Sequence, residues 1–285
     1  KWKAAIKEAL PGTEAKLINE DLMLTHIWQR LDAGARKHLQ ALTALRRPAP
    51  LEAIKTLGDQ TIRLENLGLL TRFPGEFRGM HPTVHRFVEK REGEARTEDH
   101  LRIGRWYLDT YQSNESPAIA EETVYHLSAA KEADSAAPPA GELAGHYRRT
   151  LRYSDARRVL DSVMALAPSA ELREKLLITS GNLHNDLGRY DLAASDFQAV
   201  IDSSHKRDPS GEKEASGLHG LANALFRLGR YEEAVEAYNK ALEIQKQAYG
   251  TEAHPEYAAS LHGLANALDS LGRYEEAVEA YNKAL

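Results

Sequence analysis

The stretch GLHGLANALFRLGRYEEAVEAYNKAL, residues 217–242, returns as SLHGLANALDSLGRYEEAVEAYNKAL at residues 260–285. The two blocks differ at three positions: Gly217/Ser260, Phe226/Asp269 and Arg227/Ser270. The second block begins 43 residues after the first. Self-similarity at a fixed period of this length is typical of a solenoid, in which each unit packs mainly against its neighbours. The repeat therefore decides the fold of this part of the chain.

Apolar residues of the first block recur at helical spacing on either side of Gly229. They are Leu218, Leu221, Ala222, Leu225 and Leu228 before it, and Ala234, Val235, Tyr238, Ala241 and Leu242 after it. This spacing predicts two amphipathic helices, and a glycine between them suits a helix end because it tolerates positive φ. Each block should therefore form a helical hairpin, with the small Ala222 and Ala234 at the helix crossing.

These residues resemble the tetratricopeptide repeat, whose pattern is Leu, a small residue, Gly-x-Tyr-x-x-Ala, an aromatic residue and a further Ala. The first block matches through Leu221, Ala222, Gly229, Tyr231, Ala234, Tyr238 and Ala241, and the second through Leu264, Ala265, Gly272, Tyr274, Ala277, Tyr281 and Ala284. Family repeats usually carry about 34 residues. The extra length here resembles the kinesin-light-chain-like subgroup.

Weaker copies precede the two blocks. They show at Tyr153, Ala156, Leu160, Val163 and Pro168, and again at Gly188, Tyr190, Ala193 and Phe197. The anchor alanines Ala156, Ala193, Ala234 and Ala277 are spaced 37, 41 and 43 residues apart. The sequence thus predicts a right-handed α-solenoid of about four hairpins in residues 141–285, with the last hairpin incomplete or uncapped.

Residues 1–95 follow a different pattern. Helices are expected through Trp2–Leu10, Leu24–Leu31, Leu39–Leu45, Ile54–Leu57, Ile62–Leu67 and from Pro82 onward, and strands at Leu69–Phe73 and Phe77–Met80. Pro74-Gly75-Glu76 between the two strands is a hairpin signal. Three helices followed by a hairpin predict a winged-helix domain. Residues 96–140 are expected to be a helical connector, with a flexible break at 134–139.

Residues 31–57, 62–72 and 79–87 resemble the winged-helix domain of NB-ARC and related STAND signalling NTPases. That family ends its second wing strand with Met-His-Asp, and the histidine contacts the β-phosphate of bound ADP. Met80-His81-Pro82 matches the first two positions and departs at the third. The resemblance implies that His81 senses ADP or ATP held by an upstream nucleotide-binding domain of an intact parent.

The position of His81 supports this role independently, because free N–H groups and the positive dipole end at a helix start attract phosphate. The alternative is a polar residue at a strand–helix corner. No phosphate-binding loop G-x-x-x-x-G-K-[ST] occurs, since Lys55-Thr56 lacks both glycines. The chain itself is therefore expected to be no enzyme, with no catalytic residue and no cofactor of its own.

In tetratricopeptide arrays the first helix of each hairpin lines the concave face. Asn182, Asn223 and Asn266 each stand eleven residues before an anchor alanine, so they share one register. The family uses Asn here to hold the backbone of an extended peptide, because an amide offers both a donor and an acceptor. The residues expected to flank this row are His219, His262, Phe226 and Arg227. The alternative is that copied repeats inherited the asparagines together and that they face water.

Composition excludes several classes of function. The 285 residues contain no cysteine, which rules out disulfides and thiol catalysis and agrees with a reducing cytoplasm. No apolar run approaches the roughly 20 residues of a membrane helix. The net charge is −5, and residues 1–100 hold 17 Lys/Arg against 14 Asp/Glu, too little excess to suggest nucleic acid. His81 and His85 lack a third ligand at matching spacing, so no metal site is predicted.

The sequence therefore predicts a mainly α chain that is the C-terminal fragment of a STAND-type NTPase. Its repeats would bind a protein or peptide partner, and its winged helix would help hold the ADP-bound closed state. Partner binding would shift the closed and open populations by its differential affinity, and oligomerisation on activation is left open. The alternative is a constitutive tetratricopeptide scaffold. A winged-helix transcription regulator is disfavoured, because Gln60–Leu67 carries one basic residue, Arg63, balanced by Glu65.

Overall fold

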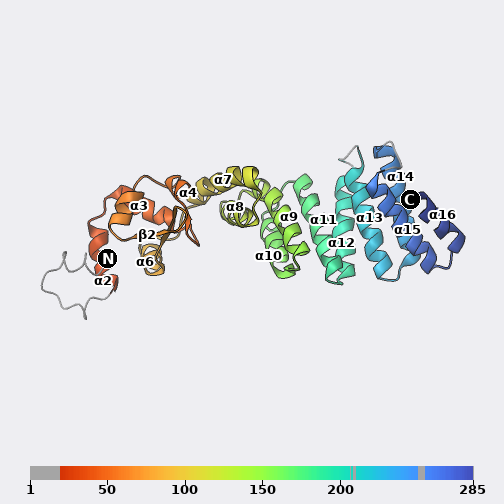
Figure 1. Cartoon of the computed structure of the whole chain (residues 1–285), viewed down its shortest axis with the longest axis horizontal. Coiled ribbons are helices and arrows are strands. Elements are labelled where there is room, and N and C mark those ends of the chain that lie inside the picture. Colours follow the sequence, from red (N-terminus) through yellow and green to blue (C-terminus); the bar gives the residue numbers. More distant parts are fainter. Residues whose placement is uncertain (1–19, 206, 208–209, 250–253, 285) are drawn as a thin grey trace. The chain divides into compact units, whose positions relative to one another are not determined.

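The computed structural model describes residues 20–205, 207, 210–249 and 254–284 (Figure 1). The chain divides into two compact units, Lys1–Glu132 and Ala133–Leu285. The helix predicted through Trp2–Leu10 lies outside the described residues.

The first unit is built from helices and one small sheet. Its elements are α2 (Glu20–Gln29), α3 (Ala33–Leu42), β1 (Ala49–Pro50), α4 (Leu51–Lys55), α5 (Thr61–Asn66), β2 (Leu70–Phe73), β3 (Phe77–Met80), α6 (Pro82–Glu92), α7 (Thr97–Asn114) and α8 (Pro117–Ala129). The predicted sequence of three helices followed by an antiparallel hairpin is present. The strand β1 was not predicted; it pairs with β3 at one edge of the sheet, in the order β1-β3-β2. Pro50 fits there because an edge strand does not require every backbone N–H.

One hydrophobic core runs through this unit. Its members include Leu24 and Trp28 of α2, Leu39 and Leu42 of α3, Ile54 of α4, Leu64 of α5, Phe87 of α6, and Ile103 and Tyr107 of α7. Because α7 buries its apolar face in this core, the unit extends to Glu132. The predicted boundary at residue 95 differs, since the apolar spacing of α7 shows a helix but not the core that it joins.

The second unit consists of paired helices that follow one another in order (Figure 1). They are α9 (Ala133–Arg149), α10 (Tyr153–Met164), α11 (Ala170–Asp186), α12 (Tyr190–Ser204), α13 (Glu212–Arg227), α14 (Tyr231–Tyr249), α15 (Pro255–Ser270) and α16 (Tyr274–Ala284). Gly229 has φ +76° between α13 and α14, as the pattern predicts. Ala222 and Ala234 are completely buried, which confirms their place in the packed interior.

The predicted flexible break at 134–139 is wrong. Residues 133–149 form the continuous helix α9, with Pro138 and Pro139 inside it. Proline in a helix interior removes a hydrogen bond and costs about 3 kcal/mol. Burial offsets this cost, because Ala136, Ala137 and Ala140 are almost fully buried.

Glycines allow aromatic rings to pack between neighbouring hairpins. A Cβ atom added at Gly220 would lie 2.3 Å from Cε1 of Phe197, and one added at Gly181 would lie 2.7 Å from Cζ of the same ring. Gly263 makes the same close approach to Tyr238, at 2.4 Å. Phe197 and Tyr238 on second helices therefore each pack against a glycine on the first helix of the next hairpin, Gly220 and Gly263.

Candidate partner-binding groove

The first helices of three successive hairpins surround one pocket of about 290 Å³. Its lining comes from Ile178 and Asn182 of α11, Ser216, His219 and Gly220 of α13, and Glu256 and Ala259 of α15, with Phe197 of α12 and Gln245 of α14. The pocket brings together Asn182 and His219, two of the residues predicted to contact a partner. Asn223, Asn266 and His262 do not line it.

Asn223 is held in a chain of hydrogen bonds. Its Oδ1 accepts from the Tyr238 hydroxyl at 2.7 Å, and its Nδ2 lies 2.9 Å from Nε2 of His219. If Nδ2 donates, Nε2 accepts, and Nδ1–H of His219 then donates to Oγ of Ser260, 2.9 Å away. Burial lowers the pKa of His219, in agreement with a neutral ring. The chain of bonds fixes the His219 ring at the edge of the pocket.

The second block repeats part of this arrangement. The Tyr281 hydroxyl donates to Oδ1 of Asn266 at 2.6 Å, and the ring of Tyr281 meets that of His262 edge-on at 5.3 Å. His262 is exposed. Within the described residues, Nδ2 of Asn266 makes no hydrogen bond, so this amide keeps a free donor where that of Asn223 does not.

Phe226 and Arg227 contact other side chains at the end of α13. The Phe226 ring lies 5.5 Å from that of Tyr231, and Arg227 donates to the Tyr190 hydroxyl at 3.0 Å. Neither residue lines the pocket. In the second block Asp269 replaces Phe226, and Tyr274 is 65% exposed. The difference between the blocks therefore changes packing at the hairpin turn.

Gln245 is the lining residue that sequence reasoning missed. It is 1% exposed, and its Oε1 has no hydrogen-bond partner among the described residues. A signal was present: Gln245 stands eleven residues after Ala234 and seven after Tyr238, on the face of α14 that carries its buried apolar residues. A polar residue on this buried apolar face of α14 indicates either a buried hydrogen bond or a binding site.

His81 lies at the start of α6 in the first unit. Its Nδ1 accepts from the backbone N–H of Thr83 at 3.2 Å, so the ring itself caps the helix. His81 also lines a pocket of about 230 Å³, whose other walls include Met23, Leu24 and Ile27 of α2. Among the residues that the structure describes, no lysine or arginine belongs to this lining. His85 points elsewhere, with Nε2 lying 3.0 Å from the Thr43 carbonyl oxygen.

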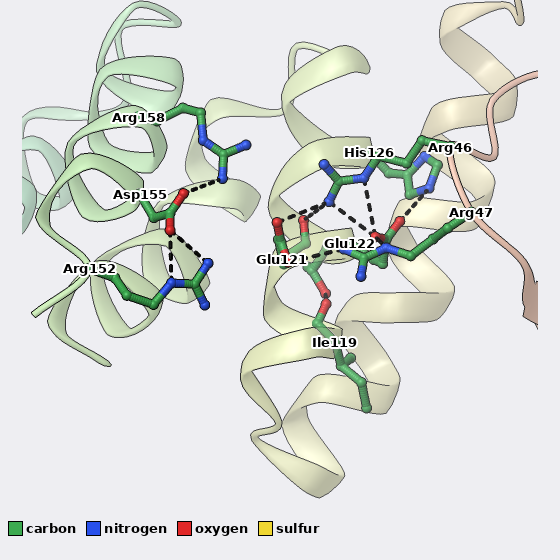
Figure 2. A network of polar contacts seen from close by, with 10 residues as sticks. Arg46, Arg47, Ile119, Glu121, Glu122, His126, Arg152, Asp155 and Arg158 are labelled. Carbon is green, nitrogen blue, oxygen red and sulfur yellow. Dashed lines mark hydrogen bonds and ion pairs between the residues drawn. The ribbon is translucent and has the colours of Figure 1, made fainter. Parts of the chain in front are cut away.

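A polar network anchors α8 within the first unit. Figure 2 shows Arg46 and Arg47 turned toward Glu121 and Glu122. Glu122 is 6% exposed and forms ion pairs with both arginines, and Glu121 pairs with Arg47 at 3.0 Å. Nearby, His126 is fully buried, and burial lowers its pKa to about 3. The network satisfies a buried carboxylate and offers no pair of groups poised for acid–base chemistry.

A separate exposed cluster on α10 of the second unit, also visible in Figure 2, joins Asp155 to Arg152 and Arg158. Within the described residues, no group of three or more potential metal ligands gathers. None of the helices described is long and apolar enough to cross a membrane.

Comparison with known proteins identifies the repeats. Residues 171–247 and 213–285 both match the family model of the tetratricopeptide repeat. This region, α11 to α16, is thus a helical-repeat array of the protein-interaction class. Its repeats are tetratricopeptide repeats, as the sequence pattern indicates. A search of curated protein sequences gave no significant match.

Several solved structures are similar to the chain. A protein from Podosopora anserina with nearly identical, kinesin-light-chain TPR-like repeats is 23% identical, covers 66% of this chain and 92% of its own, and has a TM-score of 0.49. A STAND protein with a tetratricopeptide repeat sensor, from Pyrococcus horikoshii, is 18% identical over 96% of this chain and 53% of its own, with a TM-score of 0.45. MamA from Desulfovibrio magneticus is 18% identical over 66% and 92%, with a TM-score of 0.46.

Proposed function

We propose that the repeat array binds an extended peptide segment of a partner protein across its first helices. The observation that carries this proposal is the pocket shared by α11, α13 and α15, with the Asn182 amide on its wall. Within the described residues the Asn182 side chain makes no hydrogen bond and is partly exposed. It can therefore donate to and accept from a peptide backbone, a gain of about 1 kcal/mol per hydrogen bond.

Asn266 would extend the contact along the array. Because Tyr281 holds its Oδ1, the amide is oriented with Nδ2 available to donate to a peptide carbonyl. Asn223 has a different part in this proposal. Its bonds to Tyr238 and His219 position the His219 ring, so Asn223 shapes the groove more than it contacts the peptide.

The proposal extends to the first unit as the regulatory part of a STAND-type NTPase. Residues 1–95 would form a winged-helix domain with leading helices, and His81 would contact the β-phosphate of ADP bound to an upstream nucleotide-binding domain. The supporting observation is the exposed His81 ring, which uses Nδ1 to cap α6 and so directs Nε2 away from the helix.

A constitutive scaffold would use the same groove without a switch. The shared pocket supports that alternative equally, because it concerns peptide binding alone. A nucleotide-binding module encoded upstream of Lys1 would favour the regulatory reading, and its absence from the full gene would favour the scaffold.

Hydrogen exchange of the backbone amides, measured with and without a bound peptide, tests which helices of the array contact the peptide. The probe is a peptide selected on the full chain from a displayed library of random sequences. We expect added protection at the peptide-facing parts of α11, α13 and α15, because binding there suppresses local opening. Protection confined to α12, α14 and α16 would contradict the proposal and place the site on the second helices.

A further inference from the structure

Gln245 presents an amide in a place where an amide is costly. The side chain is 1% exposed, lines the pocket between α11, α13 and α15, and leaves its Oε1 without a partner among the described residues. A buried polar group without a hydrogen bond destabilises the folded state, because it has lost its hydrogen bonds to water and gained none in return. The fold of the array does not require this cost, because an apolar residue of the same length would fill the position.

The preceding hairpin shows how the same register is satisfied elsewhere. Ser204 stands eleven residues after Ala193, as Gln245 does after Ala234. Ser204 is also fully buried, but its Oγ donates to the Ile201 carbonyl oxygen of its own helix at 3.4 Å. The longer Gln245 side chain has no such local partner, so its amide remains available to whatever enters the pocket.

The other residues that line the pocket indicate the chemical character of its ligand. Asn182 provides a second amide with no hydrogen bond in the described part of the chain, and Ser216 provides a hydroxyl. Phe197 and Ile178 supply apolar surface. Among the described residues of the lining, Glu256 carries the one formal charge; it is exposed and has other interactions. Two neutral amides facing a partly apolar pocket match a neutral group that both donates and accepts.

We propose that this pocket is a carboxamide-binding site, with the amides of Gln245 and Asn182 pairing with one carboxamide of the bound peptide. The carboxamide is either an Asn or Gln side chain or a backbone peptide unit. Its N–H would donate to one of the two pocket amides, and its C=O would accept from the other. The inference rests on the proposed function and adds to it the chemical group that the pocket selects.

The test is a double-mutant cycle between protein and peptide. The protein variant is Gln245→Met, which keeps the length of the side chain and removes the amide. One set of peptides derived from the selected sequence replaces each Asn or Gln by Leu, and a second set N-methylates each backbone amide. Ser204→Ala is the matched control, because it removes a buried polar group at the same register that is already hydrogen-bonded.

We expect one peptide change to weaken binding to the wild-type protein about tenfold and to have little effect on Gln245→Met, with Ser204→Ala behaving as wild type. The set in which this change occurs tells whether the carboxamide is a side chain or a backbone unit. Unliganded Gln245→Met should also melt at a higher temperature than wild type, because an unpaired buried amide is gone.

The inference would be overturned if every peptide change weakened binding to wild type and to Gln245→Met by the same factor. Failure of the proposed function is a separate result. In that case the peptide would bind a chain with Asn182 and Asn266 both replaced by alanine as tightly as wild type. If binding depends on the asparagines but not on Gln245, the proposed peptide-binding groove is supported and the proposed carboxamide site is wrong.

Discussion

At the scale of single residues, the chain uses buried polar groups in two different ways. His38 and His126 of the first unit are 2% and 0% exposed, and burial lowers their pKa to about 4 and about 3. Nδ1 of His38 accepts from the backbone N–H of Gln60 at 3.0 Å, which requires an unprotonated nitrogen. Oε1 of Gln245 in the second unit is buried without a partner among the described residues, as Nε2 of His38 and of His126 are. Gln245 is assigned to a ligand because it also lines the pocket between α11, α13 and α15.

The lowered pKa of His126 predicts a dependence of stability on pH. The unfolded state takes up a proton near pH 6.5, whereas the folded state does so near pH 3, so stability is lost as pH falls between these values. His126→Phe keeps the stacking on Tyr107 and removes the titration. From pH 7 to pH 5 the wild type should lose about 2 kcal/mol more than this variant.

Tryptophan fluorescence during urea unfolding measures this loss, because Trp28 and Trp106 lie in the first unit and residues 133–285 contain no tryptophan. Exposed His262 in the second unit is the control, and its replacement by Phe should leave the profile unchanged. The groups facing His126 are Glu122, His100 and Arg46, with the ring of Tyr107 stacked on it. Equal losses in wild type and His126→Phe would show that His126 becomes protonated in the folded state.

At the scale of elements, the helical spacing of apolar residues predicted the hairpins, and the details of packing did not follow from it. Helix α9 forms in spite of two prolines because its alanines are buried. This burial depends on packing against other segments, which no local sequence pattern reveals. The short strand β1 likewise depends on pairing with β3, far along the chain. Glycines were predicted at the hairpin turns. Gly181, Gly220 and Gly263 lie within helices instead, where the missing side chain lets an aromatic ring pack closely against the backbone.

This packing predicts opposite effects for two substitutions of glycine by alanine within helices. Gly220→Ala should destabilise the second unit by about 1–3 kcal/mol, because the new methyl group would overlap the buried Phe197 ring. Gly141→Ala in α9 should stabilise it by about 0.5–1 kcal/mol, since its Cβ would meet Leu176 at an ordinary 3.5 Å. Denaturation followed by circular dichroism compares the two. A gain in stability for both would mean that Phe197 does not lie against Gly220.

At the scale of the whole molecule, the chain consists of two units that the sequence divided at a different place. The duplicated block made the repeat class predictable, because its pattern of small and aromatic residues is local. The extent of the first unit was not predictable, because Ile103 and Tyr107 of α7 join a core formed by residues far from them in sequence. For the same reason the sequence aligned three asparagines but could not show that Asn223 bonds to Tyr238 and His219.

In the function proposed above, a partner peptide contacts the first helices through their asparagines. The most direct measurement is a binding titration of the selected peptide against two double variants of the full chain. One carries Asn182→Ala with Asn266→Ala, and the other carries Asn239→Ala with Asn282→Ala, which are exposed on the second helices α14 and α16. We expect the first variant to bind at least tenfold more weakly than wild type, since two or more hydrogen bonds of about 1 kcal/mol each are lost. The second variant should bind like wild type. Equal affinity of wild type and the first variant, or weakening by the second alone, would contradict the proposed function.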